Sequence, residues 1–462
     1  MNADEIRRAF LDLMAGTGHK RLTRAPLVLR DDPTTLFTGS GMQPLLPYLL
    51  GAPHPLGTRL TDVQPCLRAQ DMDEVGDNRH TTFFEMLGNW SLGDYSKAEQ
   101  IPRLFHFLVD VVGLDPARIY VSAFIGDPEH GIPRDEESAD IWERLFAERG
   151  VDCRRIDLDT EQRGNEIGNQ GARIAFYGHK NWWSRSGGPD QMPVGDPGGP
   201  DSEVFYYFPQ VRHDTRFGRY PHQNSDGGQF LEIGNSVFMT FRKTAEGFAE
   251  LPHHNVDFGG GLERIAAAAL DSPDVYRVNL LWPIVAKLQE LTGKAYTDAT
   301  EAMRVVTDHL RGAAFLAADG IAPANKEQGY VMRRLVRRAL RFGLDLGLEH
   351  GAAADVVPVV ARTYADVYPE IAERQGDIVA VLTKEERAFG RTLGKGLARL
   401  PKLPQPVTAA ALFELHDTYG MPVELAVEEV RREGRSLDPD WSAGYAELVE
   451  AQRARSRAGR SS

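Results

Sequence analysis

Hydrophobic and polar residues alternate in the first part of the chain in a pattern typical of β-strands. Glu203–Phe208 is a short aromatic and β-branched run that stops before Pro209, and it predicts a strand. Phe230–Phe241 predicts a longer strand with one face formed by Ile233, Asn235, Val237 and Met239. Residues 184–200 are rich in Gly and Pro and predict an irregular loop.

The pattern changes at about residue 275, where apolar residues recur at helical spacing. Examples are Val305, Leu310 and Ala314, followed by Val331, Leu335 and Leu340. Two segments, Gly394–Gly396 and Pro401–Pro406, are expected to break helices, and Trp441–Arg455 predicts a last helix. The fold class predicted is α+β: an antiparallel sheet flanked by helices, followed by an all-helical domain. The expected boundaries are 1–270, 271–435, and 436–462 for a C-terminal helix with a frayed tail.

Composition narrows the class of protein. The 462 residues are too many for one core, which favours two or three domains. No stretch approaches the ~20 apolar residues of a membrane helix, and the N-terminus lacks a secretion signal. Two cysteines cannot form a disulfide framework or a four-thiolate zinc site, so we expect a cytoplasmic protein. The net charge of −13 disfavours nonspecific nucleic-acid binding, although a local basic stripe could still hold phosphates.

The densest chemical signal is a predicted strand–loop–strand between Cys66 and Asn89. Each arm carries an arginine, Arg68 on the first and Arg79 on the second, and Phe84 lies on the second arm. A guanidinium matches phosphate oxygens and a flat ring can stack on a base, so the hairpin suits a nucleotide. The alternative is an ordinary hairpin with an exposed arginine and core phenylalanines, and the pattern alone leaves that open.

A glycine-rich turn forms the second signal. Asn255–Phe258 reads as a strand, Gly259–Gly261 as a turn, and Leu262–Ala269 as the start of a helix. Glycines allow a ligand to approach the backbone, and a helix N-terminus favours anions. Arg264 could add a positive charge and Asp257 could accept hydrogen bonds from an ammonium group. A simple strand-to-helix turn is the competing interpretation.

The third signal is an arginine stripe on a predicted helix. Its members lie at i, i+1, i+4, i+5 and i+8: Arg333, Arg334, Arg337, Arg338 and Arg341. Such a stripe suits phosphates. A solvated face paired with acidic residues elsewhere is the alternative.

These three pieces, in this order, resemble the ATP-binding signatures of class II aminoacyl-tRNA synthetases, and specifically the alanyl-tRNA synthetase family. Thr82–Tyr95 resembles that family's hallmark string, Asp32–Met42 its first motif and Val256–Arg264 its third. The resemblance continues through Asp308–Arg311, Pro323–Asn325, Gly329–Arg334 and Asp417–Pro422. It spans about residues 10 to 455 and implies a class II synthetase sheet followed by a helical tRNA-recognition domain.

The resemblance implies roles in activating alanine. Arg68 is expected to bind the ATP α-phosphate and the alanine carboxylate, and Arg264 with Phe84 to sandwich the adenine. Arg79 and His80 are expected near the outer phosphates. Asp257 is expected to receive the amino group, helped by Asn235. A methyl-sized pocket is expected to be walled by Met86, Trp183, Val237 and Gly259. The implied cofactors are ATP and Mg²⁺, with Glu203 or Glu232 as alternative magnesium ligands.

The resemblance also implies that the acceptor stem of tRNA(Ala) is recognised. Asn325 and Asp417 match the positions that read its G·U pair, and Arg333, Arg334, Arg337 and Arg338 would position phosphates. A helix-capping role is the alternative for both Asn325 and Asp417.

Some residues depart from the family pattern and bear on specificity. Gly234 and Ser236 flank Asn235 where a tryptophan and an aliphatic residue are usual, and Phe258 and Gly260 stand where Thr and Met are usual. A small pocket also rejects glycine and serine poorly, because one group contributes only ~1–3 kcal/mol. Since the resemblance stops before the family's editing domain, we expect mischarging unless a separate protein edits.

The expected activity is that of an alanine–tRNA ligase, with no membrane association and a monomeric state. Two alternatives stay open. One is a paralogue that supplies an aminoacyl-adenylate or charged tRNA to specialised metabolism, and the other is a noncatalytic module that binds tRNA or an amino acid.

Overall fold

The computed structural model describes residues 1–29, 35–348 and 350–458, and it divides into two compact units. Unit 1 comprises Met1–Asp71 and Asn78–Trp282, and unit 2 comprises Met72–Asp77 and Pro283–Ser462. Part of the motif expected at Asp32–Met42 lies outside the described residues. The predicted class is confirmed: a sheet with helices, then a helical region. The functional boundaries expected at residues 270 and 435 stay a prediction.

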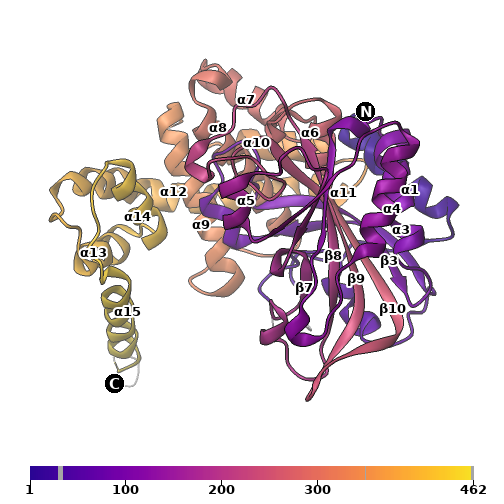
Figure 1. The fold of residues 1–462 in the computed structure, drawn as a ribbon. Coiled ribbons are helices and arrows are strands. Elements are labelled where there is room, and N and C mark those ends of the chain that lie inside the picture. Colours follow the sequence, from indigo (N-terminus) through magenta and orange to yellow (C-terminus); the bar gives the residue numbers. More distant parts are fainter. Residues whose placement is uncertain (30–34, 349, 459–462) are drawn as a thin grey trace. The chain divides into compact units, whose positions relative to one another are not determined.

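A ten-stranded sheet forms unit 1 (Figure 1). Its order is β1–β2–β3–β10–β9–β8–β4–β6–β5, with β7 paired to β8. The bounds in that order are Lys20–Arg21, Arg59–Leu67, Phe83–Leu92, Gly247–Gly261, Phe230–Thr244, Pro197–Tyr207, Ile119–Phe124, Ile174–Tyr177 and Arg155–Asp159, and β7 is Trp182–Ser184.

The central strands from β2 to β4 are antiparallel, as expected. In addition, parallel pairs occur at both edges: β1 with β2, and β6 with β4 and β5. The predicted hairpin is confirmed, with Cys66 opposite Phe84. The strand expected at Phe230–Phe241 is also confirmed, as β9.

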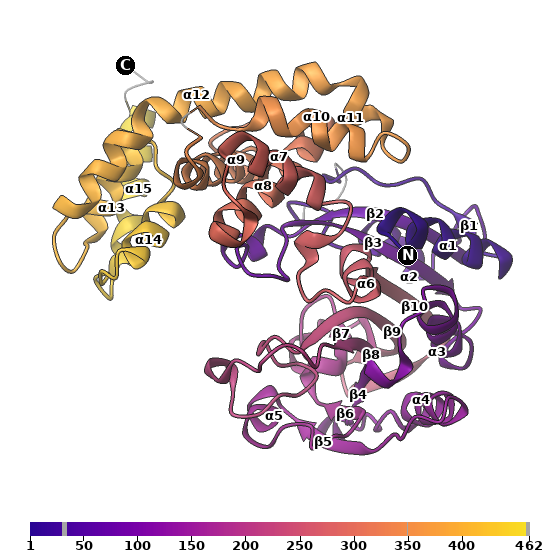
Figure 2. The ribbon, with the colours of Figure 1, turned by 90° about the horizontal axis from the view of Figure 1, so that it is seen from above.

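Helices accompany the sheet (Figure 2). Their bounds are α1 Ala3–Gly16, α2 Leu46–Leu49, α3 Lys97–His106, α4 Glu136–Glu148, α5 Glu161–Ile167 and α6 Leu262–Ala269. On one face, Phe10 of α1 lies 6.2 Å from the Phe258 ring of β10, and Arg7 pairs with Glu85 of β3 at 2.6 Å. Because side chains alternate along strands, Phe84 and Asp257 must lie on the opposite face. That opposite face holds the candidate site.

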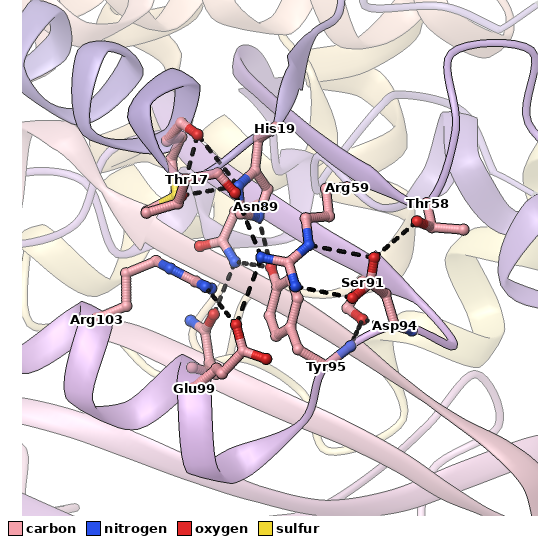
Figure 3. Close-up of polar contacts among 12 residues, drawn as sticks. Thr17, His19, Thr58, Arg59, Asn89, Ser91, Asp94, Tyr95, Glu99 and Arg103 are labelled. Carbon is pink, nitrogen blue, oxygen red and sulfur yellow. Dashed lines mark hydrogen bonds and ion pairs between the residues drawn. The ribbon is translucent and has the colours of Figure 1, made fainter.

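A polar network on the helix side attaches the hairpin to its surroundings (Figure 3). The Asn89 amide donates to Tyr95 Oη at 2.8 Å and to Gln100 Oε1 at 2.7 Å. His19 Nε2 lies 2.7 Å from the same Tyr95 oxygen. Burial is the main cause that lowers the pKa of His19 to about 4, so its ring is neutral at physiological pH. The network therefore ties β3 to α1 and α3 without a buried imidazolium.

Two expectations about breaks in regular structure are wrong. Residues 197–200 belong to β8 rather than to a loop. A Cβ at Gly199 would lie 1.9 Å from Phe238 O, so glycine here permits a close approach of two strands. Gly394–Gly396 does not break a helix either, because α12 continues to Arg399. Gly396 is buried there, and a Cβ would lie 3.1 Å from Met421.

Unit 2 is built from helices. Their bounds are α7 Trp282–Thr292 (its first residue in unit 1), α8 Thr300–Ala318, α9 Glu327–Leu346, α10 Ala353–Thr363, α11 Pro369–Glu373, α12 Gln375–Arg399, α13 Ala409–Tyr419, α14 Val423–Arg432 and α15 Trp441–Ala458. One apolar cluster joins α9, α12, α13 and α14 through Leu340, Phe389, Leu415 and Val430. The helix predicted for the arginine stripe is confirmed as α9.

Candidate active site

A cleft on the open face of unit 1 brings together residues that are far apart in the sequence. Its empty volume is about 620 Å³, including the part open to solvent, which is the size of a small-molecule site. All five residues predicted to bind ATP line it: Arg68, Arg79, His80, Phe84 and Arg264. Met86 and Gly259, predicted for the amino-acid pocket, line the same cleft.

Arg68 is held at the end of β2 with its guanidinium over an aromatic ring. Its Nε donates to Gly39 O at 3.1 Å, and its Cζ lies 5.0 Å from the centre of the Phe84 ring. Among the described residues, neither Nη atom has a hydrogen-bond partner. Two donors are thus available in the cleft, in the fork geometry that matches a phosphate or carboxylate.

Two further guanidinium groups are oriented by backbone carbonyls at the start of β9. Arg264 Nη1 donates to Glu232 O at 3.1 Å, and Arg79 Nη1 donates to Phe230 O at 3.2 Å. Arg264 stands on α6, directly after the Gly259–Gly261 turn. The two motifs therefore place three arginines in the lining of one nucleotide-sized cleft: Arg68, Arg79 and Arg264.

The amino-acid end of the site is formed by neighbours across the strands. Asp257 of β10 lies opposite Trp90 of β3 and Val237 of β9. Trp90 Nε1 donates to Asp257 Oδ1 at 2.7 Å. Burial raises the pKa of Asp257 to about 7, an effect that the Trp90 hydrogen bond partly opposes. The Asp257 carboxyl group therefore lies between an indole N–H donor and an aliphatic side chain.

The floor next to Asp257 is closed by an apolar cluster. Trp90 and Val237 pack in it together with Leu49 and Met239, and the partly buried Trp183 packs against it. On the other side, a Cβ at Gly259 would lie 2.8 Å from Met86 Sδ, so the glycine leaves room for the Met86 side chain to lie over the backbone of β10. This arrangement restricts the space available to a side chain near Asp257.

Two buried acids continue this row: Glu203, considered above as a magnesium ligand, and Asp201, which the sequence reasoning missed. Asp201 of β8 lies on the far side of Val237, and Glu203 lies beside Asn235. Asn181 Nδ2 donates to Asp201 Oδ1 at 2.8 Å, while Asn224 Nδ2 donates to Glu203 Oε2 at 3.2 Å. Burial is the largest cause that raises the pKa of both acids, that of Asp201 to about 7. Asp201 and Glu203 are two residues apart, a spacing that places both side chains on the same face of a strand, and this spacing was the signal available in the sequence.

Comparison with known proteins agrees with this geometry. The family described as tRNA synthetases class II (A) matches residues 5–462. The alanine–tRNA ligase of Treponema pallidum is 39% identical over 99% of this chain and 73% of its own length. That of Rubrobacter xylanophilus is 36% identical over 99% of this chain and 50% of its own length. The chain belongs to the class II tRNA synthetases. Among solved synthetases, the apo S. aureus histidyl-tRNA synthetase has a TM-score of 0.32 at 11% identity, over 58% of this chain and 65% of that one.

Three of the departures from the synthetase family pattern, at Gly234, Phe258 and Gly260, pack against one another, and Gly234 also lines the cleft. A Cβ at Gly234 would lie 3.0 Å from the Phe258 ring, and one at Gly260 would lie 2.9 Å from it. Phe258 is 1% exposed, so its ring fills the space over both glycines. The Phe258 ring therefore occupies the space that a larger residue at 234 would need.

A magnesium ligand set is not evident among the described residues of this synthetase. No group of three or more His, Cys, Asp or Glu side chains gathers there in a metal-binding arrangement. Of the two acids considered, Glu232 lines the cleft, whereas Glu203 is buried under Asn224. Of the two, the accessible carboxylate of Glu232 is the one that would hold Mg²⁺, which would neutralise phosphate charge.

The arginine stripe of α9 is largely neutralised within unit 2. Arg337 and Arg341 pair with Glu385 and Glu429, each at 2.7 Å. Arg338 is 2% exposed, and it donates to Glu428 and to two carbonyls of residues 72–77. Arg334 pairs with Asp73. This pattern corresponds to the alternative in which acidic residues compensate the stripe.

The two predicted G·U-reading residues are exposed in unit 2, and neither is a helix cap. Lys326 is the N-cap of α9, and Asn325 Oδ1 instead accepts a hydrogen bond from Arg333. Asp417 lies inside α13 and accepts from Gln452 of α15. The capping interpretation of both residues is therefore wrong, and their polar atoms contact the partly buried side chains of Arg333 and Gln452. Within the described part of the chain, no helix is long and apolar enough to cross a membrane.

Proposed function

We propose that this chain is an alanine–tRNA ligase that activates alanine with ATP and Mg²⁺ and transfers it to tRNA(Ala). The observation that carries the proposal is the convergence of Arg68, Phe84 and Arg264 on one cleft, with Asp257 on the same face beside a restricted apolar space. The names of the relatives and the family membership support it. The proposal includes a monomer working in the cytoplasm.

The chemistry requires positioning rather than a protein nucleophile. A carboxylate oxygen of alanine attacks the α-phosphorus, and pyrophosphate leaves with its electron pair. The Arg68 Nη groups would hold both reacting anions and stabilise the charge that develops between them. The adenine would stack on Phe84 near Arg264, and the ammonium group would bind Asp257. The terminal ribose hydroxyl of tRNA then attacks the carbonyl carbon, and AMP leaves.

ATP–pyrophosphate exchange with each of the twenty amino acids, with and without tRNA, tests this proposal. We expect exchange with alanine in the absence of tRNA, weaker exchange with serine and glycine, and none with larger amino acids. No exchange by the folded protein would favour the noncatalytic alternative. Exchange without any charging of tRNA would favour the paralogue that supplies an adenylate.

Replacing Asn325 by alanine should affect the transfer of alanine to tRNA without affecting the activation of alanine. Exchange should be unchanged, because Asn325 belongs to unit 2 and contacts Arg333 there. Charging of tRNA(Ala) should lose about 10-fold or more in kcat/KM, since one base contact contributes ~1–3 kcal/mol. Charging assays with a G·U and a G·C acceptor stem provide the measurement. If the variant still discriminates the two stems as the wild type does, Asn325 does not read this pair.

A further inference from the structure

The segment between β8 and β9 has an exposed surface that the proposed chemistry does not use. Arg212, Arg216 and Arg219 are exposed there, together with Phe217 (46%) and Tyr220 (41%). Cations interleaved with aromatic rings are the side chains that bind single-stranded nucleic acid, because rings stack on bases and arginines hold phosphates. In a chain of net charge −13, this grouping is a local exception.

The positive charge of this segment is only partly compensated. Arg216 pairs with Asp214 at 2.6 Å. Among the described residues, Arg212 and Arg219 have no ion-pair partner. Of the acids on the adjacent helix α5, Glu161 pairs with Lys180 at 2.9 Å. Two cations are therefore available to an anionic partner.

The exposed surface is held in place and is not a free loop. The backbone N–H groups of Arg219 and Tyr220 donate to Asn165 O of α5 at 2.9 and 3.1 Å. The buried His222 ring lies between Asn165 Oδ1 at 3.0 Å and Tyr177 Oη at 2.7 Å. Figure 2 shows the long connection beside α5. A fixed surface loses little entropy when a ligand binds.

The same segment borders the cleft. A Cβ at Gly228 would lie 3.2 Å from Val211 and 3.6 Å from the Arg79 guanidinium, which lines the nucleotide end. Asn224 donates to Glu203, which lies beside Asn235 at the amino-acid end. The segment therefore lies next to Arg79 of the cleft lining at one point and next to Glu203 at another.

We propose that residues 208–229 receive the unpaired 3′ end of tRNA, with bases stacked on Phe217 and Tyr220 and phosphates held by Arg212 and Arg219. This inference rests on the proposed function, because a tRNA terminus has to reach the adenylate across the margin of this cleft. An unpaired strand is favoured over a duplex since bases can stack on rings only where they are not stacked on each other.

Binding of two tRNA(Ala) transcripts tests the inference: one intact, and one lacking its last four 3′ nucleotides. The wild-type protein should bind the intact transcript about 10-fold more tightly, from the ~1–3 kcal/mol of one stacked base. The variant Arg212→Ala/Phe217→Ala/Arg219→Ala should bind both transcripts equally, and Phe217→Trp should keep the preference. The exposed variants Arg144→Ala and Leu270→Ala are matched controls that should also keep it.

The outcomes separate this inference from the proposed function. Alanine-dependent exchange by the triple variant should equal that of the wild type, which also shows that it is folded. A triple variant that still prefers the intact transcript overturns the inference. A triple variant that loses affinity equally for both transcripts also overturns the inference, since the segment would then attract only duplex phosphates. Absence of exchange in the wild type would instead defeat the proposed function.

Discussion

Replacing Arg68 by alanine should reduce alanine-dependent ATP–pyrophosphate exchange by about a thousandfold. Arg68 lines the cleft and its Nε is held by Gly39 O, so the charge is already oriented before substrates bind. An oriented charge stabilises the transition state more than the separate substrates. The loss should therefore appear mainly in kcat at saturating ATP and alanine.

Arg68→Lys is the matched control, because it retains the charge but not the planar fork. It should restore part of the exchange. Thermal unfolding of both variants should be close to that of the wild type, since Arg68 makes one side-chain hydrogen bond to the described protein. An Arg68→Ala enzyme with more than a tenth of the wild-type kcat would show that this guanidinium does not act on the reacting groups.

Replacing Asp257 by asparagine should lower kcat/KM for alanine by about 100-fold, since a charge-assisted hydrogen bond to the ammonium group is lost. The pKa of about 7 adds a dependence on pH. Below pH 7 the free protein holds Asp257 protonated and neutral, so kcat/KM for alanine should rise as pH increases from 6 to 8. The asparagine variant should lack this rise.

Asp201→Asn provides the control for this titration. Asp201 lies on the other side of Val237 with a similarly raised pKa of about 7, but it does not contact Trp90. If this variant loses the pH dependence and Asp257→Asn keeps it, the titrating group has been misassigned. Stability gives a second readout: a raised carboxyl pKa makes the unfolding free energy fall as pH rises from about 4 to 7, and Asp257→Asn should reduce that fall.

Much of the nucleotide end could be predicted from the sequence because its residues lie in short, continuous motifs. Arg68 and Phe84 belong to one hairpin, and Arg264 follows a glycine turn, so local patterns determined their surroundings. The alternation along β9 likewise placed Asn235 and Val237 on one face, and the register confirms that these neighbours face Gly259 and Asp257.

The other contacts around the candidate site depend on which strands become neighbours in the fold. A single sequence does not show which strands pair. The bond from Trp90 to Asp257 joins residues 167 positions apart. Asp201 and Asn181 meet only because β7 and β8 pair beside β9. The same limit applies to the arginines of α9, whose carboxylate partners come from α12 and α14. Helical spacing shows which arginines share a face, but not which acids cover that face.

The packing of Phe258 between Gly234 and Gly260 means that these three positions cannot be exchanged one at a time. A larger residue at 234 or 260 would collide with a ring that has almost no exposed surface, and shortening that ring alone would leave a void. Grafting the usual tryptophan of the family onto position 234 should therefore succeed only in a chain already altered at 258. The three positions therefore form one packing unit, in which a larger residue at 234 or 260 requires a smaller one at 258.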